Sequence, residues 1–204
     1  MAAGIILLLA AVFYRLALAL SGSAFTGTWA NFTPLVAIAF CGAMLFRGPA
    51  RWLVPLGALF FSDILLYFVY PMSADIVTML VRYLALGGIV LAAGHFGSLK
   101  ATPQGWFRSL AGVTLCSLGF YLITNSFSWL LEPAYAKSLA GWVQAITVGV
   151  PGYVPSWMFF RNALVGDLFF TALFLATLQL TNRQNSSAAL QDAQKIIPSH
   201  KPLS

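Results

Sequence analysis

The chain has 204 residues, of which 60% are hydrophobic and 8% are charged, and its formal net charge is +6. Soluble domains carry about 25% charged residues, so this composition excludes an ordinary soluble protein and indicates an integral membrane protein. The positive charge does not call for a nucleic acid partner, because Lys and Arg lie largely in short loops and a polar tail, as a topology signal does.

Apolar runs bounded by glycine, proline or charged residues predict six transmembrane helices, since about 20 residues cross the hydrocarbon core. The predicted spans are residues 4–20, 33–46, 53–70, 76–97, 107–124 and 157–180. The expected fold is therefore all-α, a polytopic membrane helix bundle. It forms a single transmembrane domain over residues 1–180, followed by a polar tail, 181–204, that we expect to be disordered or loosely helical.

The positions of Lys and Arg in the loops predict the orientation of the bundle. Seven of them follow the second, fourth and sixth spans: Arg47, Arg51, Lys100, Arg108, Arg183, Lys195 and Lys201. This side is predicted to be cytoplasmic, with both termini inside.

The second span is short and begins with a helix-start signal. Thr33 can cap the helix and Pro34 can take its first position, where a missing N–H costs nothing. Three predicted helix N-termini then face outward with partial positive charge. Together with Arg15, Arg82 and Arg161, each just inside the outer end of a span, they predict an electropositive outer half.

Two aspartates lie deep in predicted spans, Asp63 in the third and Asp167 in the sixth. A charge at bilayer depth costs roughly 2.5 to 3.5 kcal/mol on insertion scales, so each carboxylate needs a compensating role. One interpretation is that they contact a solute or couple an ion. The other is that they pair with arginines or backbone donors on neighbouring helices. Arg161 and Asp167 are about 240° apart around one helix and should not pair with each other.

A polar stripe follows one face of the fifth span at steps of three and four residues. It consists of Thr114, Ser117, Tyr121, Thr124 and Asn125. Such a stripe should face protein or an aqueous cavity rather than lipid. A purely structural role stays open, because Ser and Thr also bond back to their own helix.

The outer segment 126–156 is too apolar for an ordinary loop. Residues 137–150 can form an interfacial helix that acts either as a lid over an outward-facing cavity or as a plain anchor. The sequence leaves open whether residues 137–156 are interfacial, re-entrant or spanning. Small residues at four-residue spacing, Ala39 with Ala43 and Ala172 with Ala176, either pack the bundle internally or offer a docking face for a partner in the cytoplasmic half, and the sequence does not separate the two.

Motifs of enzymes are absent: there is no G-x-S-x-G, H-E-x-x-H, Walker A or C-x-x-C. We therefore expect no enzyme, no catalytic residue, no metal site and no cofactor.

Five motifs follow one another along the chain: NFTPLVAIAFCGAMLF (31–46), WLVPLGALFFSD (52–63), FYLITNSFSWL (120–130), YAKSLAGW (135–142) and FFRNALVGDLFFTALF (159–174). Their succession resembles a family of bacterial inner-membrane proteins of unassigned function. That family is commonly grouped with the substrate-binding S components of energy-coupling factor (ECF) transporters.

The resemblance implies a six-helix S component in the bacterial cytoplasmic membrane that binds a vitamin, cofactor precursor or metal ion from outside. It also implies as partners, besides the lipid bilayer, a coupling protein and ATPases that dock on the cytoplasmic half. The chain departs from the pattern in one respect, since its first helix lacks the Ala-x-x-x-Ala motif that S components often carry.

The leading hypothesis is a substrate-binding membrane protein for uptake of a small, anionic or hydrogen-bond-rich solute. The alternative is a structural or assembly protein whose buried charges only lock the bundle. The candidate substrate-binding residues are Arg15, Asn31, Asp63, Arg82, Tyr121, Asn125, Arg161, Asn162 and Asp167.

Overall fold

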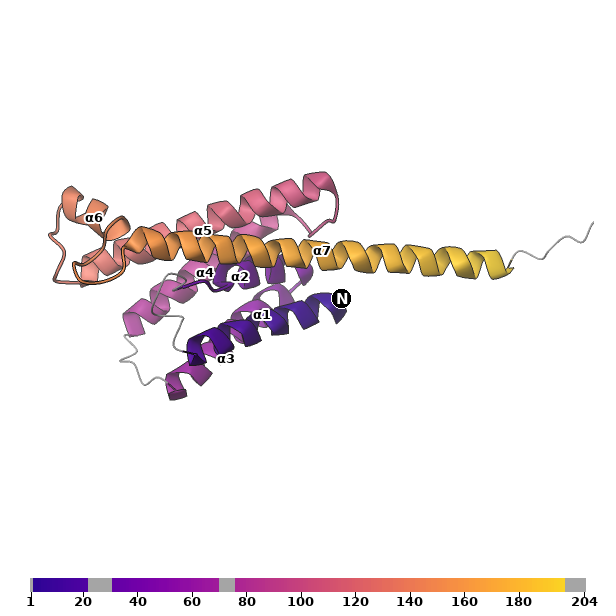
Figure 1. The fold of residues 1–204 in the computed structure, drawn as a ribbon, viewed down its shortest axis with the longest axis horizontal. Coiled ribbons are helices and arrows are strands. Elements are labelled where there is room, and N and C mark those ends of the chain that lie inside the picture. Colours follow the sequence, from indigo (N-terminus) through magenta and orange to yellow (C-terminus); the bar gives the residue numbers. More distant parts are fainter. Residues whose placement is uncertain (1, 22–30, 70–75, 197–204) are drawn as a thin grey trace, which may run out of the picture.

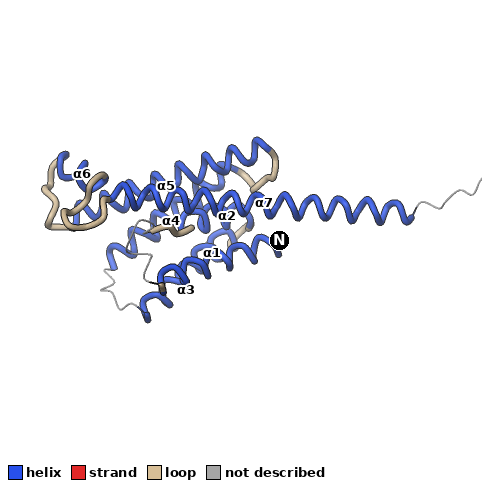
Figure 2. Tube along the Cα trace, viewed as in Figure 1, coloured by secondary structure: helices blue, strands red, loops and turns tan. Residues whose placement is uncertain are grey.

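The computed structural model describes residues 2–21, 31–69 and 76–196. This part of the chain is helical, with no strand (Figures 1 and 2). Its helices are α1 (Ala2–Leu20), α2 (Leu35–Leu45), α3 (Ala50–Val69), α4 (Ile76–Phe96), α5 (Pro103–Leu131), α6 (Leu139–Ile146) and α7 (Ser156–Ile196). The expected all-α fold is confirmed.

Four of these helices, α3, α4, α5 and α7, are long and apolar enough to cross a membrane. The other two predicted spans correspond to α1, an apolar helix of 19 residues, and to the short apolar helix α2. The prediction of six full spans is therefore not confirmed. The clearest difference is α2, whose 11 residues extend only about 16 Å, against about 30 Å of hydrocarbon.

Helix α2 is the centre of the bundle. Every residue from Val36 to Met44 is buried, and the helix packs against α1, α3, α4, α5 and α7. A helix that is apolar on all sides is typical of such a position. Two glycines let neighbours approach: a Cβ on Gly42 would lie 2.7 Å from Cβ of Pro55, and one on Gly112 would lie 2.6 Å from Cζ of Phe40.

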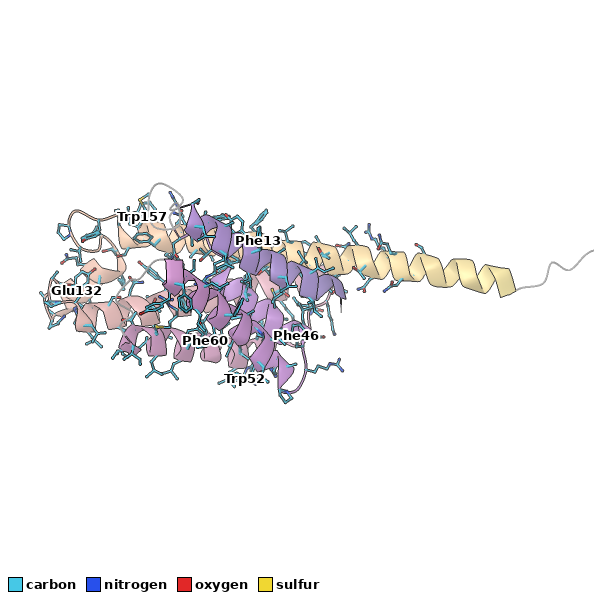
Figure 3. The ribbon with its side chains drawn as sticks, turned by 90° about the horizontal axis from the view of Figure 1, so that it is seen from below. Phe13, Phe46, Trp52, Phe60, Glu132 and Trp157 are labelled. Atoms are coloured by element: carbon cyan, nitrogen blue, oxygen red, sulfur yellow. The ribbon has the colours of Figure 1, made fainter. Side chains whose placement is uncertain are left out.

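The outside of the bundle is also apolar. Large hydrophobic side chains are exposed on several helices, among them Phe13 (72%) on α1 and Phe107 (74%) on α5. Figure 3 shows Phe13 and Phe60 among the side chains on the outer surface. Exposed apolar surface of this extent marks contact with lipid or protein, and on helices of this length it indicates a membrane protein.

Helix α7 runs as one element from Ser156 to Ile196, 41 residues in all, and its last part extends beyond the other helices (Figure 1). Residues 181–196 of the polar tail are therefore helical, which is one of the two expected arrangements, and residues 197–204 lie outside the described residues. The start of α1 and the extension of α7 lie toward the same end of the bundle (Figure 1).

The segment between α5 and α7 does not cross the bundle. Its helix α6 has eight residues and lies at the end opposite to the α7 extension (Figure 1). Of the three arrangements that the sequence left open for residues 137–156, a seventh span is excluded.

The alanine pairs proposed for docking differ in exposure. Ala39 and Ala43 are 0% and 4% exposed because they belong to the central helix, which matches internal packing for this pair. Ala172 and Ala176 are partly buried on α7.

Candidate functional site

The first buried carboxylate, Asp63 on α3, is held by side chains from α1 and α4. Arg15 donates from Nη2 to Oδ1 of Asp63 and from Nη1 to Oγ of Ser62. Tyr83 donates its hydroxyl to Oδ2 of Asp63 at 2.7 Å, and Nη1 of Arg82 lies 3.6 Å from the same oxygen. We call these five residues the Asp63 cluster.

In the Asp63 cluster, the buried charges of Arg15 and Asp63 are paired with each other. The side chains of Arg15 and Asp63 are each 9% exposed, and both carboxylate oxygens have donors. A buried pair is tolerated in this way only when its geometry and hydrogen bonds compensate desolvation. Three of the predicted site residues, Arg15, Asp63 and Arg82, are thus brought together with one another, which matches the pairing interpretation.

The second buried carboxylate, Asp167 on α7, serves a helix end. Asp167 is 1% exposed. Oδ1 accepts the amide of Ala37 at 2.9 Å, Ser117 donates its hydroxyl to Oδ2 at 2.7 Å, and the backbone of Val36 lies close to this carboxylate. Since the first amides of a helix have no intrahelical acceptor, Asp167 acts as the cap of α2 from another helix.

This arrangement corrects the predicted start of the second span. The N-cap position is taken by Pro34, and no side-chain cap comes from that position, whereas the sequence pattern placed Thr33 there with Pro34 in the helix. The cap is supplied across the bundle because the start of α2 is buried, where unpaired amides are costly.

The turn before α2 is shaped to approach α7. Asn31 has a positive φ of 64°, and its carbonyl accepts the amide of Thr33 at 2.9 Å. A Cβ on Gly166 would lie 3.4 Å from both N and O of Thr33, at ordinary van der Waals distance, so this part of α7 lies directly beside the turn. Asp167, the next residue, thereby reaches the first amides of α2.

A cavity of about 90 Å³ lies between the turn before α2, the polar stripe of α5 and the first half of α7. We call it the α2–α5–α7 cavity. Four predicted site residues line it: Asn31, Tyr121, Asn125 and Asp167. Ser117 and Thr124 of the predicted stripe line it as well, and its described lining contains no Lys or Arg.

Residues of the polar stripe of α5 bond back to carbonyls of their own helix, and some of them also line the cavity. Thr114 and Thr124 donate their hydroxyls to the carbonyls of Leu110 and Phe120, both at 2.8 Å, as the structural interpretation expects. Asn125 donates in the same manner from Nδ2 to the carbonyl of Tyr121 at 2.9 Å. Thr114 does not line the cavity, whereas Thr124 does.

Tyr121 links the cavity to the outer segment. Its hydroxyl donates to the carbonyl of Ile146 at 2.6 Å, which is the last residue of α6. Its ring lies 4.8 Å from that of Phe160 between centroids. The cavity wall and the end of α6 are therefore joined through one side chain, although no residue of α6 lines the cavity.

The outer segment is held on the ends of α5 and α7. Trp142 donates from Nε1 to Oγ of Ser126 at 2.9 Å, and the amide of Trp157 donates to the carbonyl of Thr147 at 2.9 Å. Figure 3 places Trp157 at this end of the molecule, with Glu132. Burial raises the pKa of the Tyr135 phenol above its ordinary value, and the nearby Glu132 carboxylate acts in the same direction.

Arg161 and Asn162 are neighbours in the chain and in space. Arg161 donates from Nε and Nη2 to Oδ1 of Asn162, at 3.1 and 2.9 Å, and its guanidinium lies 5.5 Å from the ring centroid of Trp157. Asn162 is buried and Arg161 is exposed. Neither lines the cavity, so these two predicted site residues lie apart from it.

Several lining residues were not predicted. Ser117 was part of the polar stripe, and its place on that face was the signal that could have identified it. The aromatic residues Phe120, Phe159 and Phe160 gave no signal, because an apolar residue in a span is equally suited to lipid. Among the described residues, no group of three or more His, Cys, Asp or Glu could hold a metal ion.

A protein-family model matches residues 1–190. The chain belongs to the family of unknown function DUF6580. No curated protein and no solved structure matches it. Membership in this family agrees with the expected resemblance at the level of a family of unassigned function, and the relation to S components stays a prediction.

Proposed function

We propose that this DUF6580 protein is a solute-binding membrane protein and that the α2–α5–α7 cavity is its binding site. The observation that carries the proposal is the convergence of Asn31, Tyr121, Asn125 and Asp167 on one cavity from three parts of the chain. A few convergent polar groups among aromatic walls are typical of small-molecule sites.

The resemblance to S components is the second support. In that scheme the protein binds its solute from outside and works with a coupling protein and ATPases in the bacterial cytoplasmic membrane. The cavity of about 90 Å³ is smaller than the roughly 300 to 1,000 Å³ of sites for drug-sized ligands. It suits a compact solute, and a vitamin-sized solute requires movement of the turn before α2 or of α6.

A second candidate is a structural or assembly protein in which buried charges only fix the helices. The Asp63 cluster favours it, because Arg15 and Asp63 satisfy each other across α1 and α3.

The proposal is tested by purifying the full chain in mild detergent and identifying small molecules that co-purify, followed by saturable binding of any solute found. Two variants locate the site. Thr124→Val removes a cavity hydroxyl, whereas Thr114→Val removes a hydroxyl with the same back-bond outside the cavity. We expect Thr124→Val to weaken binding by up to about tenfold, in line with one lost hydrogen bond, and Thr114→Val to leave it unchanged.

Absence of any co-purified solute, together with no saturable binding across vitamins and cofactor precursors, contradicts the proposal and favours the structural candidate. Equal effects of the two threonine variants place the solute elsewhere.

A further inference from the structure

We infer that the α2–α5–α7 cavity selects a compact, planar solute that carries hydrogen-bond donors and no negative charge. This inference rests on the proposed function and assigns the class of its substrate. Of the two solute classes expected from the sequence, anionic and hydrogen-bond-rich, it keeps only the hydrogen-bond-rich class.

The first argument is the acceptor capacity of Asp167. Asp167 is one of the residues that line the cavity, and its oxygens accept one donor from Ala37 and one from Ser117. A carboxylate has about four acceptor positions. Capacity therefore remains for a donor from a solute, while an anion in the same cavity would meet the carboxylate charge at low dielectric.

The second argument is that the helix end is already occupied. The N-terminus of α2 would ordinarily attract an anion through its free amides and dipole. Asp167 supplies that negative group from within the protein, so a solute anion would have to compete with a tethered carboxylate for the same amides.

The third argument concerns the arginines that suggested an anion. Arg15 and Arg82 lie on Asp63 in another part of the bundle, and Arg161 lies beside Asn162 and Trp157. None of them lines the cavity. An anion would thus lack a cationic partner among the described lining residues.

The walls set the shape of the solute. Phe120, Phe159 and Phe160 line the cavity with Tyr121, and aromatic faces suit flat or cationic groups. The amides of Asn31 and Asn125 add polar contacts. The volume of about 90 Å³ is below the about 150 Å³ of an engineered cavity that holds benzene, so the solute is small.

The test uses three probes that share one planar skeleton and differ in charge and donors: acetamidinium, acetamide and acetate. Each is titrated against the full chain in mild detergent, with binding measured by calorimetry and by the shift in Tm. We expect acetamidinium to bind best, acetamide next, and acetate at least about tenfold more weakly than acetamidinium.

A matched pair of substitutions assigns the preference to one carboxylate. Asp167→Asn keeps an oxygen that can cap α2 but removes the charge, and we expect it to reduce the preference for acetamidinium over acetate to within about threefold. Asp63→Asn changes the other buried carboxylate, which does not line the cavity. Measured against its own ligand-free Tm, it is expected to keep the order of the three probes.

Acetate binding as well as acetamidinium overturns the inference, as does an unchanged preference in Asp167→Asn. If none of the three probes binds, the inference also fails. The proposed function is judged separately: it stands if another solute co-purifies and its binding responds to Thr124→Val but not to Thr114→Val, and it fails otherwise.

Discussion

Asp63 and Asp167 are two buried carboxylates in one bundle, and they are stabilised in different ways. Asp63 on α3 is met by Arg15, Arg82 and Tyr83 from neighbouring helices. Asp167 on α7 is met by the amide of Ala37 at the start of α2 and by the hydroxyl of Ser117.

The difference decides which carboxylate can serve a solute. One oxygen of Asp63 already accepts from Arg15, and the other is occupied by Tyr83 and Arg82. Asp167 has only neutral donors, and it alone of the two borders the α2–α5–α7 cavity. A buried charge in a membrane helix thus indicates function only after its partners are known.

The largest expected effect comes from breaking the buried ion pair between Arg15 and Asp63. Asp63→Ala leaves the buried Arg15 guanidinium without its carboxylate, and we expect a loss of about 3 to 5 kcal/mol in unfolding free energy, as for other broken buried pairs. Replacing both partners, by Arg15→Met with Asp63→Leu, should restore most of it. Denaturant unfolding in mild detergent measures both, and a cost below about 1 kcal/mol for Asp63→Ala would show that the pair is not a structural lock.

A smaller effect is expected at the helix cap. Asp167→Ala leaves the buried amide of Ala37 without its acceptor and the hydroxyl of Ser117 without its partner, and we expect a loss of about 2 to 3 kcal/mol. Asp167→Asn should cost less than about 1 kcal/mol, because its amide oxygen still accepts an N–H. The same unfolding measurement applies. Equal losses for the two substitutions would mean that the charge, rather than the cap, stabilises α2.

The smallest effect is expected at the turn that leads into α2. Asn31 has φ of 64°, a conformation that glycine adopts freely and that costs other residues about 1 to 2 kcal/mol. Asn31→Gly should therefore leave Tm nearly unchanged, and Asn31→Val should lower it. If both lower Tm alike, the Asn31 side chain rather than its backbone conformation holds the turn beside α7.

The fold class could be predicted because it depends on local properties. Apolar runs and their boundaries identified each of the long helices, and the polar face of α5 followed from the spacing of Ser117, Tyr121 and Thr124. The number of full spans could not be obtained in this way. The predicted second span, residues 33–46, was already short, but an apolar run does not reveal that the start of α2 is buried inside the bundle, because that start depends on a cap from another helix.

The candidate site was predicted only in part, because its contacts join residues that are far apart in the sequence. The residue types in the sequence established that carboxylates, arginines and amides lie inside membrane helices and need partners. Only the tertiary structure decided the partners: it joins Arg15 to Asp63 across 48 positions and Asp167 to the amide of Ala37 across 130. Sequence by itself determined an apolar helical protein with buried charges, since composition and periodicity are local. Which charge is locked and which faces a cavity was decided by helix packing, which brings together residues that no local pattern connects.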